Sequence, residues 1–149
     1  MAHHHERREL PFSAQQMYEL VADVDRYPEF LPWVIGTRIR SNSDTEMLAD
    51  MIVGFRNLRE TFSSRVQKTP GERIEVDYLD GPLKELNNIW IFEEAPTGGC
   101  IVDFTVDFTF RNRVFQTIAG QFFDKALRKM TDAFIVRAEA LYGSSNSNA

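Results

Sequence analysis

The sequence has one cysteine, three histidines and no long apolar run. Cys100 cannot form an internal disulfide, which is typical of a protein in a reducing cytoplasm. No segment approaches the roughly 18–20 apolar residues that a membrane-spanning helix needs. The N-terminus MAHHHERRE also lacks the apolar centre of a secretion signal. These absences predict a cytoplasmic protein.

Sequence signatures of catalytic sites are absent as well. There is no G-x-S-x-G, H-E-x-x-H or C-x-x-C motif, no phosphate loop and no G-x-G-x-x-G turn. The histidines, His3, His4 and His5, are adjacent, so on an extended strand they point to alternate faces, which does not suit a metal site. We interpret the run as a frayed, solvated end of the chain, native or added. No histidine is then expected to act as a buried general base.

Carboxylates occur in pairs at two places. Asp23, Asp25 and Glu29 follow an expected helix, where acidic loops are commonly solvated. Asp103 and Asp107 occupy the polar phase of an alternating segment, so we expect them to face away from the interior. The sequence therefore predicts no enzyme, no catalytic residue and no metal or cofactor. A cyclase or hydrolase acting in an interior cavity is a disfavoured alternative, since no inward acid or histidine is expected.

The chain is rich in aromatic residues instead, with 12 phenylalanines among 149 residues. Hydrophobic residues make up 43% and charged residues 26%, which are ordinary globular values. The net charge of −5 and pI of about 5.2 argue against binding to DNA. The length suits one domain with one core, so we predict a single domain over residues 1–142 and a disordered tail over 143–149.

The first part of the chain predicts a strand and two short helices. A strand is expected around His5–Leu10, and Ser13-Ala14-Gln15-Gln16 has the form of a capping box that opens a helix running to about Asp23. Pro28 disfavours helix at the residue before it. A separate short helical turn is therefore expected over Arg26–Trp33.

From about Val34 to Arg111 the apolar residues recur with a period of two. About six strands are expected there, which with the N-terminal strand gives about seven antiparallel strands with one polar and one apolar face. A helix of about 40 Å is expected from Val114 to Tyr142, with Arg137 on its polar side. Its apolar residues are Phe115, Ile118, Ala119, Phe122, Phe123, Ala126, Met130, Ala133, Phe134 and Leu141. A strongly curved sheet can wrap such a helix, which is the helix-grip fold of the α+β class, and the space between them becomes core or cavity.

Three segments resemble one known family. They are VADVDRYPEFLPWV, the run Gly81–Leu86 followed by Trp90, and GCIVDFTVDFTFRNRVFQTIAGQFFDKALRKMTDAF. All three are similar to the coenzyme Q-binding START-domain family, within the polyketide cyclase/dehydrase and lipid-transport superfamily. The likeness covers about residues 3–141. Leu83 stands where many relatives have Phe and keeps the apolar character.

The resemblance implies a START-like lipid-binding domain whose apolar cavity holds ubiquinone or a related polyprenyl lipid as a ligand. It also implies a non-enzymatic chaperone role in respiratory electron transport or quinone biosynthesis. A bacterial branch is similar to ribosome-association toxins that bind the large ribosomal subunit, and the fold serves both roles. Candidates for a basic ribosome-facing surface are Arg111, Arg113, Lys125, Arg128 and Lys129. The alternative is a solvated helical face with Asp124 and Asp132 as ion-pair partners.

A carrier of this kind needs an apolar tunnel with an opening. Exposing a five-carbon isoprenoid unit to water costs roughly 4 kcal/mol, and Tyr78, Asn88 and the Trp90 indole could donate hydrogen bonds to quinone carbonyls. The segment Tyr27–Trp33, stiffened by prolines, is expected to be a gate that touches the inner face of a membrane when it opens. The predicted cavity and gate residues are Tyr27, Pro28, Phe30, Leu31, Trp33, Phe55, Tyr78, Leu83, Trp90, Phe104, Phe108, Phe115, Phe122, Phe123 and Met130.

Overall fold

Seven strands, two α-helices and one 3₁₀ helix make up the described chain. The computed structural model describes residues 2–55, 58–96, 98–111 and 113–143, and the side chains of residues 3–54, 59–96, 98–111 and 125–143. In chain order the elements are β1 (Ala2–Leu10), α1 (Ala14–Ala22), the 3₁₀ helix η1 (Val24–Glu29), β2 (Val34–Asn42), β3 (Glu46–Phe55), β4 (Leu58–Thr69), β5 (Arg73–Asp80), β6 (Leu83–Glu94), β7 (Cys100–Phe110) and α2 (Arg113–Tyr142). This order is the one that the sequence predicts.

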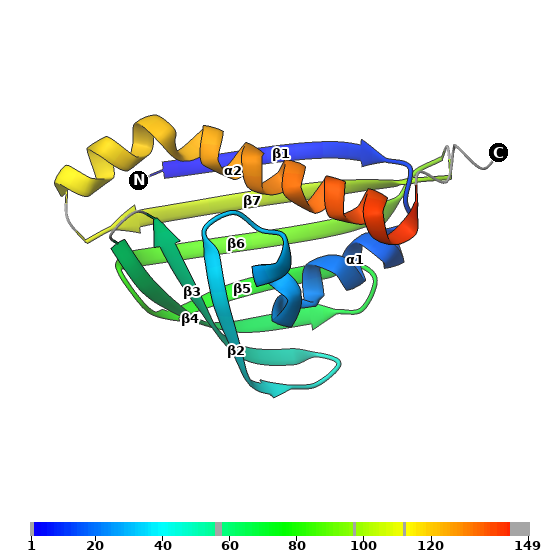
Figure 1. Cartoon of the computed structure of the whole chain (residues 1–149). Coiled ribbons are helices and arrows are strands. Elements are labelled where there is room, and N and C mark those ends of the chain that lie inside the picture. The colour runs from blue at the N-terminus through cyan, green and yellow to red at the C-terminus, as the bar shows by residue number, and fades with distance from the viewer. Residues whose placement is uncertain (1, 56–57, 97, 112, 144–149) are drawn as a thin grey trace.

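All seven strands form one antiparallel sheet in the order β1-β7-β6-β5-β4-β3-β2. The sheet curves from β1 round to β2, and α2 runs along the side of β1 and β7 while α1 packs beneath its C-terminal part (Figure 1). The α+β helix-grip prediction is confirmed. From β2 to β7, each strand is hydrogen-bonded to the strand that follows it in the chain, whereas β1 pairs with β7.

The inner face of the sheet carries the core. In β7 the buried side chains alternate with half-buried ones, so that Val102, Phe104, Val106 and Phe108 face inward. Asp103 and Asp107 face outward, as predicted. From α2, Phe134 is 2% exposed and Ala138 is fully buried. Each buried Phe contributes about 1.5–3 kcal/mol to folding, so this aromatic layer fixes where α2 meets the sheet.

The N-terminus is not a frayed end, which corrects the sequence-based interpretation. β1 begins at Ala2 and pairs with β7 along its whole length, from Ala2 opposite Phe108 to Leu10 opposite Cys100. His4 is only 4% exposed, whereas the outward-facing His3 and His5 contact Asp107 and Asp103. The predicted alternation of the histidines is therefore confirmed, but one of them lies inside the protein.

The two short helices differ in how well the sequence predicts them. The capping box of α1 is confirmed, since Gln16 N and Ser13 N each donate to the other residue's side chain at 3.0 Å. The second helix is η1, Val24–Glu29, and not the predicted turn over 26–33. It is held by i→i+3 hydrogen bonds, such as the one from Arg26 N to Asp23 O at 3.2 Å. Pro28 inside this helix has no N–H group and donates no such bond.

Helix α2 has almost the predicted bounds, and Gly143 follows it with a φ of 72°, the left-handed conformation typical of a helix C-cap. Leu141, expected on the apolar face, is 52% exposed. The position four residues after Ala138 is Tyr142, whose hydroxyl donates to Gln16 O at 3.1 Å. Arg137 was expected on the polar side, but its side chain packs against Glu29 of η1 and is only 21% exposed. The predicted tail falls, from residue 144 on, outside the described residues.

Candidate ligand-binding site

One part of the sheet's inner face carries a group of half-buried apolar residues, which we call the apolar wall. Its members pack against the core but are not themselves fully covered. They are Met51, Phe62, Val76, Tyr78, Leu86 and Phe110. Met51 lies opposite Phe62 across β3 and β4, and the Phe62 and Tyr78 rings are 6.4 Å apart.

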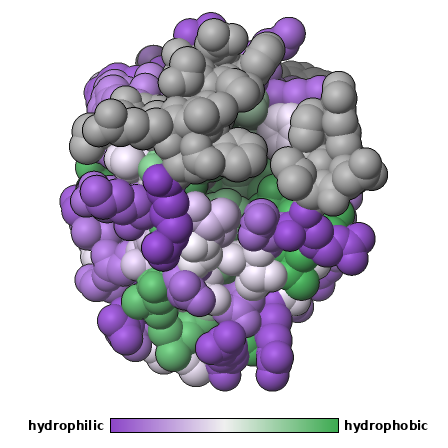
Figure 2. All heavy atoms as spheres, turned by 90° about the vertical axis from the view of Figure 1, so that its left-hand side faces the viewer, coloured by the Kyte–Doolittle hydropathy of each residue, from purple (hydrophilic) through white to green (hydrophobic). Residues whose placement is uncertain are grey.

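The apolar wall lies toward the end of the sheet where β7 ends and α2 begins. Figure 2 shows this end of the molecule, where hydrophobic residues are visible among hydrophilic side chains that border them. Partly buried apolar side chains on a concave face are typical of a site that takes an apolar ligand.

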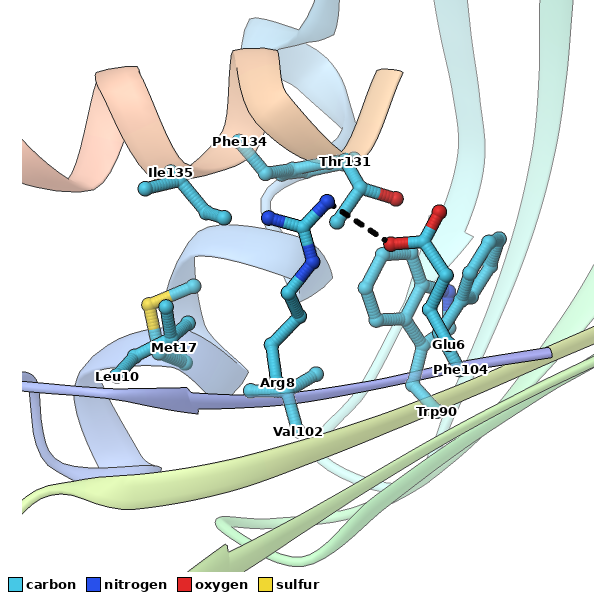
Figure 3. Close-up of a pocket in the computed structure, with 10 residues that line it drawn as sticks. All are labelled: Glu6, Arg8, Leu10, Met17, Trp90, Val102, Phe104, Thr131, Phe134 and Ile135. Atoms are coloured by element: carbon cyan, nitrogen blue, oxygen red, sulfur yellow. Dashed lines mark ion pairs between the residues drawn. The ribbon is translucent and has the colours of Figure 1, made fainter. Parts of the chain in front are cut away.

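A small cavity lies nearer the other end of the inner face, between β1, β6, β7, α1 and α2 (Figure 3). Its volume is about 10 Å³, which is room for about one water molecule. The lining residues are Glu6, Arg8, Leu10, Met17, Trp90, Val102, Phe104, Thr131, Phe134 and Ile135. Most of them are apolar, and the charged exceptions are Glu6 and Arg8 of β1.

These polar groups form a chain along the inner face of β1. The register places His4, Glu6 and Arg8 opposite Val106, Phe104 and Val102, all of which face inward. His4 Nε2 lies 2.7 Å from Glu6 Oε1, and Arg8 Nη2 lies 3.3 Å from Glu6 Oε2. The Glu6 side chain is 9% exposed. An acid and a histidine therefore do face the interior, which corrects the expectation that none would.

The predicted hydrogen-bond donors are engaged within the protein. The Tyr78 hydroxyl donates to Leu83 O and accepts from Leu83 N, both at 2.9 Å, which closes the turn between β5 and β6. Trp90 Nε1 donates to Asn88 Oδ1 at 3.1 Å, and Asn88 Nδ2 donates to Thr105 O at 3.1 Å. Asn88 lies opposite Val106, so it faces inward.

The segment expected to be a gate packs against α2. The rings of Tyr27 and Phe30 both lie 5.4 Å from the ring of Phe134 in edge-to-face contacts. Leu31 is 5% exposed and belongs to the core, whereas Pro28 is exposed. Burial, with a smaller contribution from Asp23, raises the pKa of Tyr27 far above its ordinary value, and its hydroxyl donates to Val21 O.

The other predicted site residues divide into three groups. Leu83, Trp90, Phe104 and Phe108 are buried in the core, and of these only Trp90 and Phe104 line the small cavity. Trp33 is half-buried with Lys129 Nζ 6.0 Å from its ring, and Met130 is half-buried on α2. The third group lies outside the described side chains and comprises Phe55, Phe115, Phe122 and Phe123.

The candidate basic surface is exposed where it is described. Arg111, Lys125, Arg128 and Lys129 are all exposed, while Arg113 and Asp124 lie outside the described side chains. Asp132, expected to pair with these cations, instead lies 3.1 Å from Arg8 Nη2. No helix in the described part of the chain is long and apolar enough to cross a membrane.

Comparison with known proteins gives a family and named relatives. The model of the family "Polyketide cyclase / dehydrase and lipid transport" matches residues 10–135. The ribosome association toxin RatA of Escherichia coli is 36% identical over 135 residues, which are 91% of this chain and 85% of the toxin. The coenzyme Q-binding protein COQ10 homolog B of Xenopus laevis is 32% identical over 142 residues, 93% of this chain and 58% of the frog protein.

Solved structures show the same fold. The 18 kDa protein CC1736 of Caulobacter crescentus has a TM-score of 0.78 and 35% identity, covering 97% of this chain and 100% of that one. A START superfamily protein of Mycobacterium smegmatis reaches a TM-score of 0.81 at 15% identity, covering 95% of this chain and 99% of that one. The second likeness concerns the fold alone.

Proposed function

Because the chain belongs to the polyketide cyclase/dehydrase and lipid transport family, we propose that it binds ubiquinone or a related polyprenyl lipid without transforming it. The apolar wall is the observation that carries this proposal, since six large side chains remain half-buried on the concave face of the sheet. One relative is also named for binding coenzyme Q. The cellular role would be that of a lipid chaperone in respiration or quinone biosynthesis.

The energetics of polyprenyl tails suit a wall of this kind. Each five-carbon unit that leaves an apolar phase for water costs roughly 4 kcal/mol, so a carrier has to cover the tail continuously. Aromatic and methionine side chains such as Phe62, Tyr78 and Met51 adapt well to such chains. A cavity of about 10 Å³ cannot hold an isoprenoid unit. A tail that enters this cavity would therefore have to move α2 away from the sheet.

Organic extraction tests the proposal directly. Protein purified from quinone-producing cells is extracted and analysed by mass spectrometry, and polyprenyl quinone is expected in the wild-type extract. Phe62→Glu places a charge on the apolar wall and should remove the lipid. Thr61→Glu, at the exposed neighbouring position of β4, is the matched control and should retain it. An extract of wild-type protein without polyprenyl quinone would contradict the proposal.

A second candidate function is association with the large ribosomal subunit. It is supported by the relative RatA, which aligns over 85% of its own length, and by the exposed cations Lys125, Arg128 and Lys129 on α2. Lysine and arginine clusters of this kind bind phosphate backbones with a strong salt dependence.

Cosedimentation with large ribosomal subunits tests this second function. Arg128→Glu should weaken binding. Arg65→Glu makes the same charge change at an exposed position of β4 and should leave binding unchanged. Binding that is absent at low salt, or equally weakened by both substitutions, would count against a specific basic surface.

A further inference from the structure

The carboxylate of Glu6 has an unusual position for a charged group. It projects from the inner face of β1 toward α2, beside Trp90 and Phe104 (Figure 3). Oε1 lies 2.7 Å from His4 Nε2. Oε2 lies 3.3 Å from Arg8 Nη2 as an ion pair, yet it is buried and accepts no hydrogen bond from the described residues.

Stability alone does not account for this ion pair. Well-packed apolar residues in place of a buried ion pair are often neutral or stabilising, because the charges lose their hydration. Here the surrounding residues are Val102, Trp90, Phe104 and Phe134, all buried. An unsatisfied carboxylate oxygen that faces a cavity among such residues has room for a hydrogen-bond donor there, which a water molecule or a hydroxyl group of a ligand can supply.

The chemistry of the pair specifies the ligand group. A carboxylate only accepts hydrogen bonds and a guanidinium only donates them. A hydroxyl group does both, so it can donate to Glu6 Oε2 and accept from Arg8. A quinone carbonyl only accepts, and would leave the Glu6 oxygen unsatisfied. The cavity of about 10 Å³ has room for one oxygen atom of this kind.

We propose that Glu6 and Arg8 bind a ring hydroxyl of the lipid head group, so that the protein prefers the hydroquinone, or another polyprenyl phenol, to the oxidised quinone. This inference rests on the proposed lipid-binding function and names the form of the lipid. Arg8 also lies 3.1 Å from Asp132, which is 63% exposed. Breaking this exposed ion pair costs little. The head group therefore enters the cavity between β1 and α2 at this point, as Arg8 moves away from Asp132.

The test compares two redox forms of one lipid on the purified full chain. A decyl-tailed ubiquinone analogue and its chemically reduced quinol are titrated anaerobically by calorimetry. Because a hydrogen bond to a charged group contributes more than a neutral one, the quinol should bind roughly tenfold tighter or more. This comparison needs only the wild-type protein, so it does not depend on whether a variant folds.

Substitutions then assign the preference to Glu6. In Glu6→Gln the amide NH₂ can donate a hydrogen bond to a quinone carbonyl. The oxidised quinone should then bind about as tightly as the quinol. Glu9→Gln makes the same change on the outward face of β1 and should keep it. Equal affinity of the wild type for both forms, or an unchanged preference in folded Glu6→Gln, would overturn this inference alone. Failure of both forms to bind the wild type would overturn it together with the proposed function.

Discussion

Arg137 of α2 is joined to Glu29 at the end of η1, with Nη2 2.5 Å from Oε1. The same guanidinium lies over the ring of Phe30, with its carbon 5.1 Å from the ring centre. One arginine thus connects the last helix to the start of the segment that is expected to be a gate. The two side chains are 21% and 46% exposed, so solvent screens the ion pair in part.

Loss of this arginine should loosen the segment without unfolding the protein. Arg137→Gln removes the ion pair and the ring contact, which together contribute about 1 kcal/mol. The amides of Phe30 and Leu31, which donate to Tyr27 O at 3.2 and 2.9 Å, should then exchange with deuterium about fivefold faster by local opening. Hydrogen exchange followed by NMR measures this.

Arg128→Gln is the control, because Arg128 is exposed on the same helix. Its substitution should leave the exchange of both amides unchanged. Equal protection of Phe30 and Leu31 in the wild type and in Arg137→Gln would mean that Arg137 does not hold the segment.

The elements that sequence patterns predict here are those whose signals are local. The Ser13 and Gln16 capping box depends on four consecutive residues, and apolar and polar residues alternate in the strand Cys100–Phe110 from Val102 on. The pairing of β1 with β7 joins His4 to Val106 across about a hundred residues. No local pattern shows that the strand expected around His5–Leu10 extends back to Ala2, so the sequence does not predict that His4 is buried.

The candidate site was predicted only where it is aromatic. Trp90 and Phe104 line the cavity as the apolar alternation suggests, but Glu6 and Arg8 look like solvated charges in the sequence. Their spacing of two matches a strand, and that was the available signal. The position of Arg137 could not be predicted from helix periodicity, because it depends on where η1 ends.

Phe134 should be among the most costly positions to truncate. It is 2% exposed, and its ring lies 5.3 Å from that of Trp90 and 5.4 Å from those of Tyr27 and Phe30. Phe134→Ala leaves a cavity among three aromatic rings, and we expect it to lower the free energy of unfolding by about 3–5 kcal/mol. Urea unfolding followed by circular dichroism measures the loss.

Val136→Ala provides the comparison on the opposite side of α2, where the side chain is 63% exposed. That substitution should change the free energy of unfolding by at most about 0.5 kcal/mol. If the two variants were equally stable, Phe134 would not be the contact that holds α2 to the sheet and to the segment after η1.

Asp50 should make stability depend on acid pH. Burial would raise the pKa of this 6% exposed carboxyl, but hydrogen bonds from Ser63 and Arg40, at 2.8 and 2.9 Å, together with the positive charges of Arg40 and Arg38, hold the pKa below its ordinary 3.8. A depressed pKa in the folded state stabilises the protein above the unfolded value, and that stabilisation is lost as the pH falls through the folded value.

Asp50→Asn should therefore be less stable than the wild type at pH 7, by about 1–3 kcal/mol, and the difference should shrink as the pH falls below 3.8. Urea unfolding at pH 7 and at acid pH measures it, with the exposed Asp44→Asn as control. A difference that stays constant over this range would show that the carboxylate charge of Asp50 contributes nothing.

Cys100 should resist alkylation in the folded protein. It is fully buried at the start of β7, and burial, followed by the charge of Glu94, raises the pKa of its thiol to about 11. At pH 8 roughly one molecule in a thousand would carry the reactive thiolate. Iodoacetamide labelling followed by mass spectrometry should find little adduct in native protein and complete reaction in urea.

The same raised pKa has a consequence for alkaline stability. Below the unfolded value near 9 the thiol is protonated in both states, so its full contribution to stability is present there. As the pH rises from about 9 to about 11, unfolding is favoured because only the unfolded state releases the proton. Cys100→Ala should remove that part of the pH dependence. Rapid labelling of the folded protein at pH 8 would instead mean that the turn before β7 opens readily.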